Sequence, residues 1–392
     1  MLNTNFSPWP SFSDEEIAAV SKVMQSNRVN YWTGDECRMF EREFAHWVGV
    51  DHAVSLSNGT LALDLALRAL DVGPGDEVIV TPRSFIASVS SVIAAGAAPV
   101  FADVDPDSGN LSAATIRPCI SSRTKAVIVV HLAGWPADMD PIMELASAHN
   151  IKVIEDCAQA HGAMYGDKMV GSIGHIGAWS FCQDKIMTTG GEGGMVTTND
   201  PDLWSTMWSY KDHGKSWDAI YNREHAPGFR WIHEGFGTNW RMLEMQAAIG
   251  RIQLRKMPEW TNRRNEIATK MTSVLRGLPE LVRVPMPDPR SRHAFYRLYG
   301  YVKPEGLKSG WNRDSIIAEI TARGVPVYQG TCPEIYREKA FENTAWRPLQ
   351  RLAVAVNLGE SSLMFLTHPT LNDEEVDRIC EVVSDVLTTA KC

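Results

Sequence analysis

The chain has 392 residues, of which 44% are hydrophobic and 22% are charged, a composition typical of a globular protein with a large buried core. The formal net charge of −9 argues against binding to a polyanion, because no cluster of Lys and Arg forms a basic face. The seven cysteines are scattered, without a CxxC pair or a Cys/His pair at metal-ligand spacing, so we expect no metal site and a reducing compartment. With neither a signal-like start nor an apolar run long enough for a bilayer, the sequence predicts a cytoplasmic protein without membrane or nucleic-acid partners.

Two helices are predicted near the start of the chain, over residues 14–25 behind a Ser13 cap and over 36–48. From residue 53 onward, short β-rich runs alternate with helical stretches. The predicted strands are 53–56, 77–81, 99–103, 126–131, 152–155, 178–181 and 195–198, and the helices among them are 61–70, 87–95 and 141–149. This alternation predicts an α/β fold with a mainly parallel seven-stranded sheet that is covered by helices on both faces.

A change of domain is predicted near Pro258, which separates a helical pattern over 242–254 from a charged helix over 262–278. The remainder mixes a strand over 294–302 with helices over 314–323 and 373–388. We therefore expect a large domain over residues 1–257, including the N-terminal segment, and a smaller α+β domain over residues 258–392.

Polar residues that directly follow strands are the first candidates for a site, because ligands of doubly wound sheets lie at the carboxyl ends of the strands. Residues 57–60, Ser-Asn-Gly-Thr, follow a strand and open a helix, so their backbone N–H groups and the Thr60 hydroxyl could bind a phosphate. The alternative is that Ser57 or Asn58 only caps the helix. Asp156 ends a buried strand, where its carboxylate needs either a cationic partner or a helix to cap.

A lysine beside a glycine cluster is a further candidate. Lys185 follows the strand that contains Ser180, and residues 190–194 read Gly-Gly-Glu-Gly-Gly. A lysine that forms an imine must be partly desolvated, whereas most lysines are solvated surface charges. Phe85 follows another strand and could cover a flat ring, although such a residue is more often part of a core.

Taken in order, these residues resemble the pyridoxal phosphate (PLP) dependent sugar aminotransferases of the DegT/DnrJ/EryC1/StrS group. The most specific segments are SNGTLAL (57–63), GPGDEVIVTP (73–82), IEDCAQAHGA (154–163), the block from Ser180 to Gly194, and GTNWRMLEMQAAIG (237–250). The resemblance implies the aspartate-aminotransferase-like (fold type I) architecture. It also implies that PLP, and pyridoxamine phosphate (PMP) during the reaction, is the cofactor.

The same resemblance assigns roles to individual residues. Lys185 would bind the cofactor as an imine and carry the proton, and Asp156 would pair with the pyridinium nitrogen. The remaining cofactor contacts would be Gln159 to the ring hydroxyl, Phe85 on the ring face, Gly59, Thr60 and Ser180 to the phosphate, and Asn239 to the phosphate of a neighbouring subunit. The last contact implies a homodimer with active sites at the subunit interface.

The implied reaction moves an amino group from L-glutamate to a keto-sugar in a ping-pong course. Residues 328–336 depart from the usual His-Tyr-containing stretch of the group, and with 228–234 they are similar to the branch that aminates 8-oxo-3,8-dideoxy-D-manno-octulosonate (8-oxo-Kdo) for lipopolysaccharide. Thr33, Arg230 and His293 are the candidates for substrate contacts, although Arg230 could instead pair with Glu234 at the surface. The alternatives are a nucleotide-linked 3- or 4-keto-6-deoxyhexose as the acceptor, or a regulatory protein that binds PLP without turnover.

Overall fold

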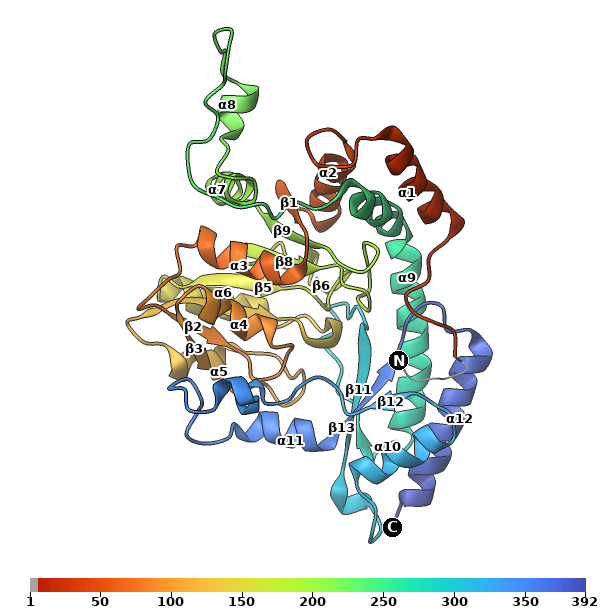
Figure 1. The fold of residues 1–392 in the computed structure, drawn as a ribbon. Coiled ribbons are helices and arrows are strands. Elements are labelled where there is room, and N and C mark those ends of the chain that lie inside the picture. The colour runs from red at the N-terminus through yellow and green to blue at the C-terminus, as the bar shows by residue number, and fades with distance from the viewer. Residues whose placement is uncertain (1–5) are drawn as a thin grey trace.

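A computed structural model of the chain describes residues 6–392, and its largest element is a seven-stranded sheet (Figure 1). The strands follow the order β1-β9-β8-β5-β4-β2-β3 across the sheet. Their bounds are β1 His52–Leu56, β9 Gly194–Thr198, β8 Ile176–Ser180, β5 Lys152–Asp156, β4 Thr124–Val130, β2 Glu77–Val80 and β3 Ala98–Phe101. Only β9 runs antiparallel to its neighbours, so the predicted mainly parallel sheet is confirmed.

Both faces of the central strands are buried, and alternate residues belong to different apolar cores. In β4, Ala126 and Ile128 pack into the core under α3, α4 and α7, whereas Val127 and Val129 pack into the core under α5 and α6. This alternation is the two-residue period of a strand, and it explains why the sequence reads as continuous apolar runs. The covering helices are α3 Gly59–Ala69, α4 Ala87–Ala94, α5 Ala113–Ile116, α6 Met139–Ala148 and α7 Pro201–Lys211.

One helix of 33 residues, α9 Glu244–Arg276, connects the two halves of the molecule (Figure 1). The sequence predicts separate helices on either side of Pro258, but α9 passes through the proline without a break. Ala247 and Leu254 pack into a core shared with α2 Glu36–Val48 and the large sheet, and α1 Asp14–Ser26 lies against α9. From Ile267 onward, residues of α9 pack into the core of the smaller sheet. Packing at both ends offsets the cost of about 3 kcal/mol for a proline within a helix. The division at residues 257 and 258 falls inside α9 and stays a prediction.

The smaller sheet is antiparallel and has the order β10-β11-β13-β12. Its strands are β10 Val282–Arg283, β11 Arg297–Val302, β13 Ser362–Leu366 and β12 Val327–Tyr328, and its helices are α10 Arg313–Ala322, α11 Ala353–Ser361 and α12 Asp373–Ala390. The short elements elsewhere are the hairpin of β6 Met164–Tyr165 and β7 Lys168–Met169, and the 3-10 turns η1 Arg117–Cys119, η2 Leu132–Gly134, η3 Pro304–Gly306, η4 Ile335–Arg337 and η5 Lys339–Phe341. None of the helices within residues 6–392 combines the length and apolarity that spanning a bilayer requires.

A projecting arm over residues 212–240 extends away from the sheet and contains the short helix α8 Trp217–Tyr221 (Figure 1). Large aromatic side chains on this arm face solvent in the single chain: Phe229 is 77% exposed, Trp231 is 83% exposed and Phe236 is 100% exposed. Rings of this size are rarely left uncovered in a stable monomer, so the arm has the character of a contact surface.

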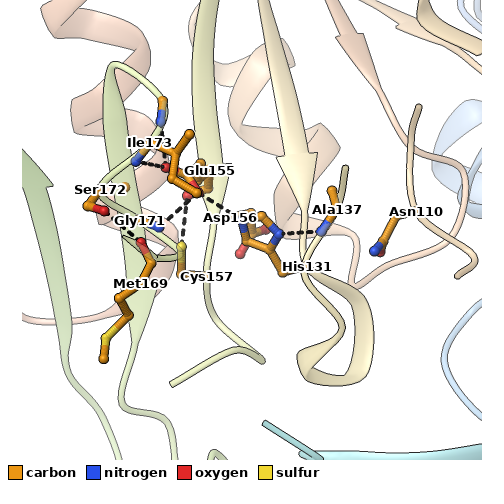
Figure 2. A network of polar contacts seen from close by, with 12 residues as sticks. Asn110, His131, Ala137, Glu155, Asp156, Cys157, Met169, Gly171, Ser172 and Ile173 are labelled. Carbon is orange, nitrogen blue, oxygen red and sulfur yellow. Dashed lines mark hydrogen bonds and ion pairs between the residues drawn. The ribbon is translucent and has the colours of Figure 1, made fainter. Parts of the chain in front are cut away.

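Glu155 in β5 anchors the loop that precedes β8 (Figure 2). The carboxylate is fully buried and accepts hydrogen bonds from the amides of Gly171, Ile173 and Gly174 at 2.6–2.8 Å. His131 Nε2 lies 3.0 Å from Oε2, and its Nδ1 accepts from the Ala137 amide at 3.0 Å. Burial by itself would raise the pKa of Glu155, but the bonds from His131 and the amides outweigh it and hold the pKa below the ordinary value of 4.5.

Replacing this carboxylate tests how much the loop depends on it. Glu155→Ala is expected to lower the free energy of unfolding by about 3–5 kcal/mol, because His131 and three amides lose their buried acceptor. Urea unfolding at pH 7 measures this difference. Because the pKa is lowered in the folded state, the stabilisation is present above pH 4.5 and is lost as the pH falls through the folded pKa, so the two proteins converge in acid. The exposed Glu144→Ala on α6 serves as the control, with an expected change within about 0.5 kcal/mol.

Candidate active site

A single cavity collects most of the residues that the sequence singles out. It has a volume of about 730 Å³ and lies where the ends of β5 and β8 meet the start of α3 and the strand β11 of the smaller sheet. The predicted residues in its wall are Gly59, Thr60, Phe85, Asp156, Gln159, Ser180 and Lys185. A second cavity of about 780 Å³, beside α3 and α7, contains none of them. The first cavity is therefore the candidate active site.

One end of the cavity is built by the first turn of α3. The Asn58 side chain accepts a hydrogen bond from the Leu61 amide at 3.0 Å. Gly59 and Thr60 are the first two residues of the helix, so their N–H groups have no intrahelical acceptors. Gly59 packs so closely against β8 that an added Cβ would lie 2.5 Å from the Cβ of Ser180. Two free amides, two hydroxyls and the positive end of the helix dipole suit a phosphate dianion. Helix capping and anion binding are thus both available, since different residues serve them.

Asp156 lies deeper in the cavity, as the last residue of β5. Its carboxylate is 5% exposed and accepts from Ser88 Oγ at 2.7 Å and from the Ala158 amide at 3.1 Å. No cationic side chain within residues 6–392 lies at ion-pair distance from it. A buried carboxylate with neutral donors alone is incompletely stabilised, so the site favours a cation next to Asp156. A protonated pyridine nitrogen fits this requirement.

Two further side chains suit a flat ring above Asp156. Gln159 Oε1 accepts from the Ala133 amide at 2.8 Å, so the side-chain NH₂ group remains free to donate into the cavity. Ala133 belongs to the tight turn η2, where its φ is 58°. Because the amide of this turn residue donates to Gln159 Oε1, the turn holds the Gln159 side chain in place. Phe85 is 64% exposed and borders the same cavity. An aromatic face left open toward a cavity is a suitable surface for stacking.

Lys185 lies in the turn that follows β8, and its side chain reaches the cavity. Its Nζ lies 5.3 Å from the centre of the Tyr296 ring, and no carboxylate within residues 6–392 is at ion-pair distance. The indole Nε1 of Trp9 donates to the Lys185 carbonyl at 2.8 Å and fixes the backbone of the turn. A half-buried amine without a counter-ion, facing an aromatic ring, is suited to form an imine with an aldehyde.

Basic groups lie buried behind the lysine. His161 is fully buried, neither ring nitrogen has a partner among the described residues, and burial together with the charges of Lys185 and Arg264 lowers its pKa to about 3. Arg264 is also fully buried, and its guanidinium lies 5.2 Å from the ring of Trp9. Burial and the nearby charge of Arg297 lower the pKa of Arg264 to about 9. The surroundings of Lys185 thus include these buried basic groups as well as the Asp184 carboxylate: burial raises the pKa of Asp184, but the charge of Lys185 and further partners outweigh this and lower it.

Four predicted site residues lie outside this cavity. Asn239 and Thr33 are exposed, the former pairing its backbone with Asp212 and the latter placing its hydroxyl 3.2 Å from Asn30 Oδ1. Arg230 is exposed on the arm, so the described chain brings it to no pocket wall. His293 is buried: its ring stacks on Phe295 at 4.0 Å, its Nδ1 accepts from the Phe295 amide, and burial lowers its pKa to about 3. The roles suggested for these residues stay predictions.

Other residues of the wall are absent from the sequence prediction. Ser88, in the first turn of α4, donates a hydrogen bond to the Asp156 carboxylate. The one feature of the sequence that points to Ser88 as a site residue is its place three residues after Phe85. Tyr296 and Arg297 enter the cavity from the start of β11, more than a hundred residues after Lys185 in the chain. No local pattern marks such residues, because only the packing of the two sheets brings them to the lysine.

Comparison with known proteins places this geometry in a family. Residues 10–384 match the model of the DegT/DnrJ/EryC1/StrS aminotransferase family. The chain is 39% identical to a GDP-perosamine synthase of Caulobacter vibrioides, over 89% of this chain and 89% of that protein.

Solved structures agree with the sequence match. An aminotransferase from Psychrobacter cryohalolentis is 57% identical, with a TM-score of 0.97 over 98% of this chain and 99% of that one. The DesV protein of S. venezuelae, solved in complex with a ketimine intermediate, is 34% identical with a TM-score of 0.84 over 95% and 94% of the two chains. The expected fold type I architecture and the PLP cofactor are thereby confirmed. The chain belongs to the DegT/DnrJ/EryC1/StrS family of PLP-dependent aminotransferases.

Proposed function

We propose that this enzyme transfers an amino group from L-glutamate to a nucleotide-linked keto-sugar. The observation that carries the proposal is one cavity in which, within residues 6–392, the Lys185 amine has no ion-pair partner, the buried Asp156 carboxylate has no cation, and the first two amides of α3 have no intrahelical acceptor. These three features correspond to the aldehyde, the ring nitrogen and the phosphate of PLP. When bound, PLP supplies the electron sink that lets the α-carbon of the donor lose a proton.

Each wall residue then has a defined task. Lys185 Nζ would hold the cofactor covalently in the resting enzyme and, once released, would move the proton from the donor's α-carbon. Asp156, whose carboxylate is fixed by Ser88 and the Ala158 amide, would keep the proton on the ring nitrogen. Gln159 would donate to the ring hydroxyl and Phe85 would cover the ring face. Gly59, Thr60 and Ser180 would hold the phosphate.

The proposal includes a homodimer in which Asn239 reaches the phosphate held by a second copy. Its support is that Asn239 is exposed and outside the cavity of its own chain, at the base of an arm with uncovered aromatic rings. An isologous pairing would place two such arms symmetrically and would cover those rings. Thr33 and Arg230, also exposed, would contact the sugar only in such an assembly.

The identity of the acceptor rests on the relatives. A GDP-perosamine synthase, named for a GDP-linked product, matches nearly nine-tenths of this chain, which favours a nucleotide-linked acceptor. A second candidate is 8-oxo-Kdo, favoured by residues 328–336, which read YQGTCPEIY instead of the usual His-Tyr-containing stretch. His293 is proposed for neither acceptor, since its ring is packed against Phe295.

The covalent link is tested by Lys185→Ala. Because the side chain makes no hydrogen bond or ion pair within residues 6–392, the variant is expected to fold, but its turnover is expected to fall by about 10²- to 10⁴-fold or more as the proton carrier is lost. Borohydride reduction followed by peptide mass spectrometry should find the cofactor on Lys185 in the wild type and nowhere in the variant. The exposed Lys168→Ala is the matched control. An adduct on another lysine, or full activity of the variant, contradicts the assignment.

The role of the buried carboxylate is tested by Asp156→Asn. The amide oxygen can still accept from the Ala158 amide, and the NH₂ group can donate to the Ser88 hydroxyl, so folding and cofactor binding should persist, while proton removal from glutamate slows by about 10²-fold or more. Ser88→Ala, which removes one bond to the carboxylate, should cost about tenfold or less. Stopped-flow absorbance during reduction by glutamate measures both rates. Equal rates in wild type and Asp156→Asn would remove Asp156 from this role.

The acceptor is tested in two separate half-reactions. Glutamate should discharge the yellow colour of the holoenzyme, and the true acceptor should restore it. We expect restoration by a GDP- or dTDP-linked 4-keto-6-deoxyhexose and none by 8-oxo-Kdo; the reverse result would support the second candidate. A colour that glutamate leaves unchanged would instead indicate a PLP-binding regulatory protein without turnover.

A further inference from the structure

The cavity contains one cationic side chain in addition to the lysine. Among the described residues of its wall, only Lys185 and Arg297 carry positive charge. Every amino-acid donor carries an α-carboxylate next to the carbon that must lose its proton. Bringing that carboxylate into a largely buried site is costly unless a cation meets it.

Arg297 and the reacting nitrogen border the same cavity and lie near the same aromatic ring. Its guanidinium carbon is 4.0 Å from the centre of the Tyr296 ring, and Lys185 Nζ is 5.3 Å from the same centre. The two cationic groups are therefore within about 9 Å of each other. An amino acid whose nitrogen replaces that of Lys185 has its α-carboxylate only two bonds away, and a guanidinium binds a carboxylate through N–H···O contacts of about 2.7–2.9 Å.

The present partners of Arg297 leave most of its donors free. Nη1 donates to the Tyr296 carbonyl at 2.8 Å, while Nη2 is 3.6 Å from Asp184 Oδ2, which is longer than a hydrogen bond. Asp184 takes its short hydrogen bond from the Tyr296 hydroxyl. A guanidinium has five N–H donors, and no other acceptor for those of Arg297 occurs within residues 6–392. The Arg297 side chain is only 12% exposed, and its contact with Asp184 alone does not compensate the burial of its charge.

Other basic groups near the lysine cannot take this role. Arg264 is fully buried and lies outside the cavity wall. His161 and His368 are neutral near pH 7, because burial and neighbouring positive charges lower the pKa of each to about 3. Arg297 is held in place by β11, which pairs with β13 over five residue positions and gives the guanidinium a rigid base.

We propose that Arg297 binds the α-carboxylate of the amino donor, as a residue that determines donor specificity. The assignment rests on the proposed aminotransferase function and adds the donor subsite to it. It also gives the small sheet a direct part in the reaction, because Arg297 is the first residue of β11. Lysine at this position would keep the charge but lose the planar fork.

The test uses the holoenzyme with donors that bind but cannot react. L-2-methylglutamate and 2-methylalanine have no α-hydrogen, so their dissociation constants can be read from the cofactor spectrum without turnover. Arg297→Gln is expected to raise the dissociation constant of both compounds by about 10- to 100-fold, with a smaller rise for Arg297→Lys. Arg292→Gln is the matched control: Arg292 is exposed, lies outside the wall and donates to the Gly162 carbonyl.

The second half-reaction separates the possible sources of the carboxylate. Restoration of the yellow colour by the keto-sugar should change less than about threefold in Arg297→Gln. If only the sugar step slows, Arg297 binds a carboxylate of an acidic sugar. If only L-2-methylglutamate loses affinity, Arg297 binds the side-chain carboxylate of the donor. If neither constant changes, Arg297 merely pairs with Asp184. Each of these three results overturns the proposal, whereas a wild type that glutamate cannot discharge would refute the proposed function itself.

Discussion

The architecture of the site depends on the different hydrogen-bond partners of two adjacent carboxylates in β5. Glu155 and Asp156 are neighbours in one strand, so their side chains point to opposite faces of the sheet. Both are buried, and a buried carboxylate must find donors or a cation. Within residues 6–392, Glu155 has four donors, three of which are amides of the loop before β8. In the same part of the chain Asp156 has two donors, both neutral, so its surroundings favour a cation.

The second requirement is the approach of two sheets. The large sheet supplies the lysine turn, the carboxylate and the helix start, while the small sheet supplies Arg297, the first residue of β11, and Tyr296 just before it. Because α9 contributes residues to the cores of both halves, the spacing between the sheets is set by a continuous helix rather than by a loop. A rigid connection of this kind suits a reaction in which one group must reach both the donor and the cofactor.

Sequence reasoning is sufficient where chemistry and local structure coincide. The strand runs, the turn at Gly59 and Thr60 in the cavity wall, and the strand-end Asp156 can be recognised because each is defined by residues close together in the chain. It fails where the outcome depends on distant packing. Pro258 reads as a helix end, yet tertiary contacts on both sides carry α9 through it, and Arg297 reads as an ordinary strand residue until the second sheet is docked. Arg230, for which the sequence offers a substrate role, lies instead on the exposed arm, outside the cavity wall.

The bond from the Trp9 indole to the Lys185 carbonyl has a practical consequence for anyone who handles the protein. Trp9 also lies against Trp260, and the neighbouring Pro8 carbonyl accepts from Thr370, so this early segment is fastened on three sides. Any substitution or chemical modification of Trp9 would therefore disturb the backbone of the lysine turn, although the two residues are 176 positions apart in the chain.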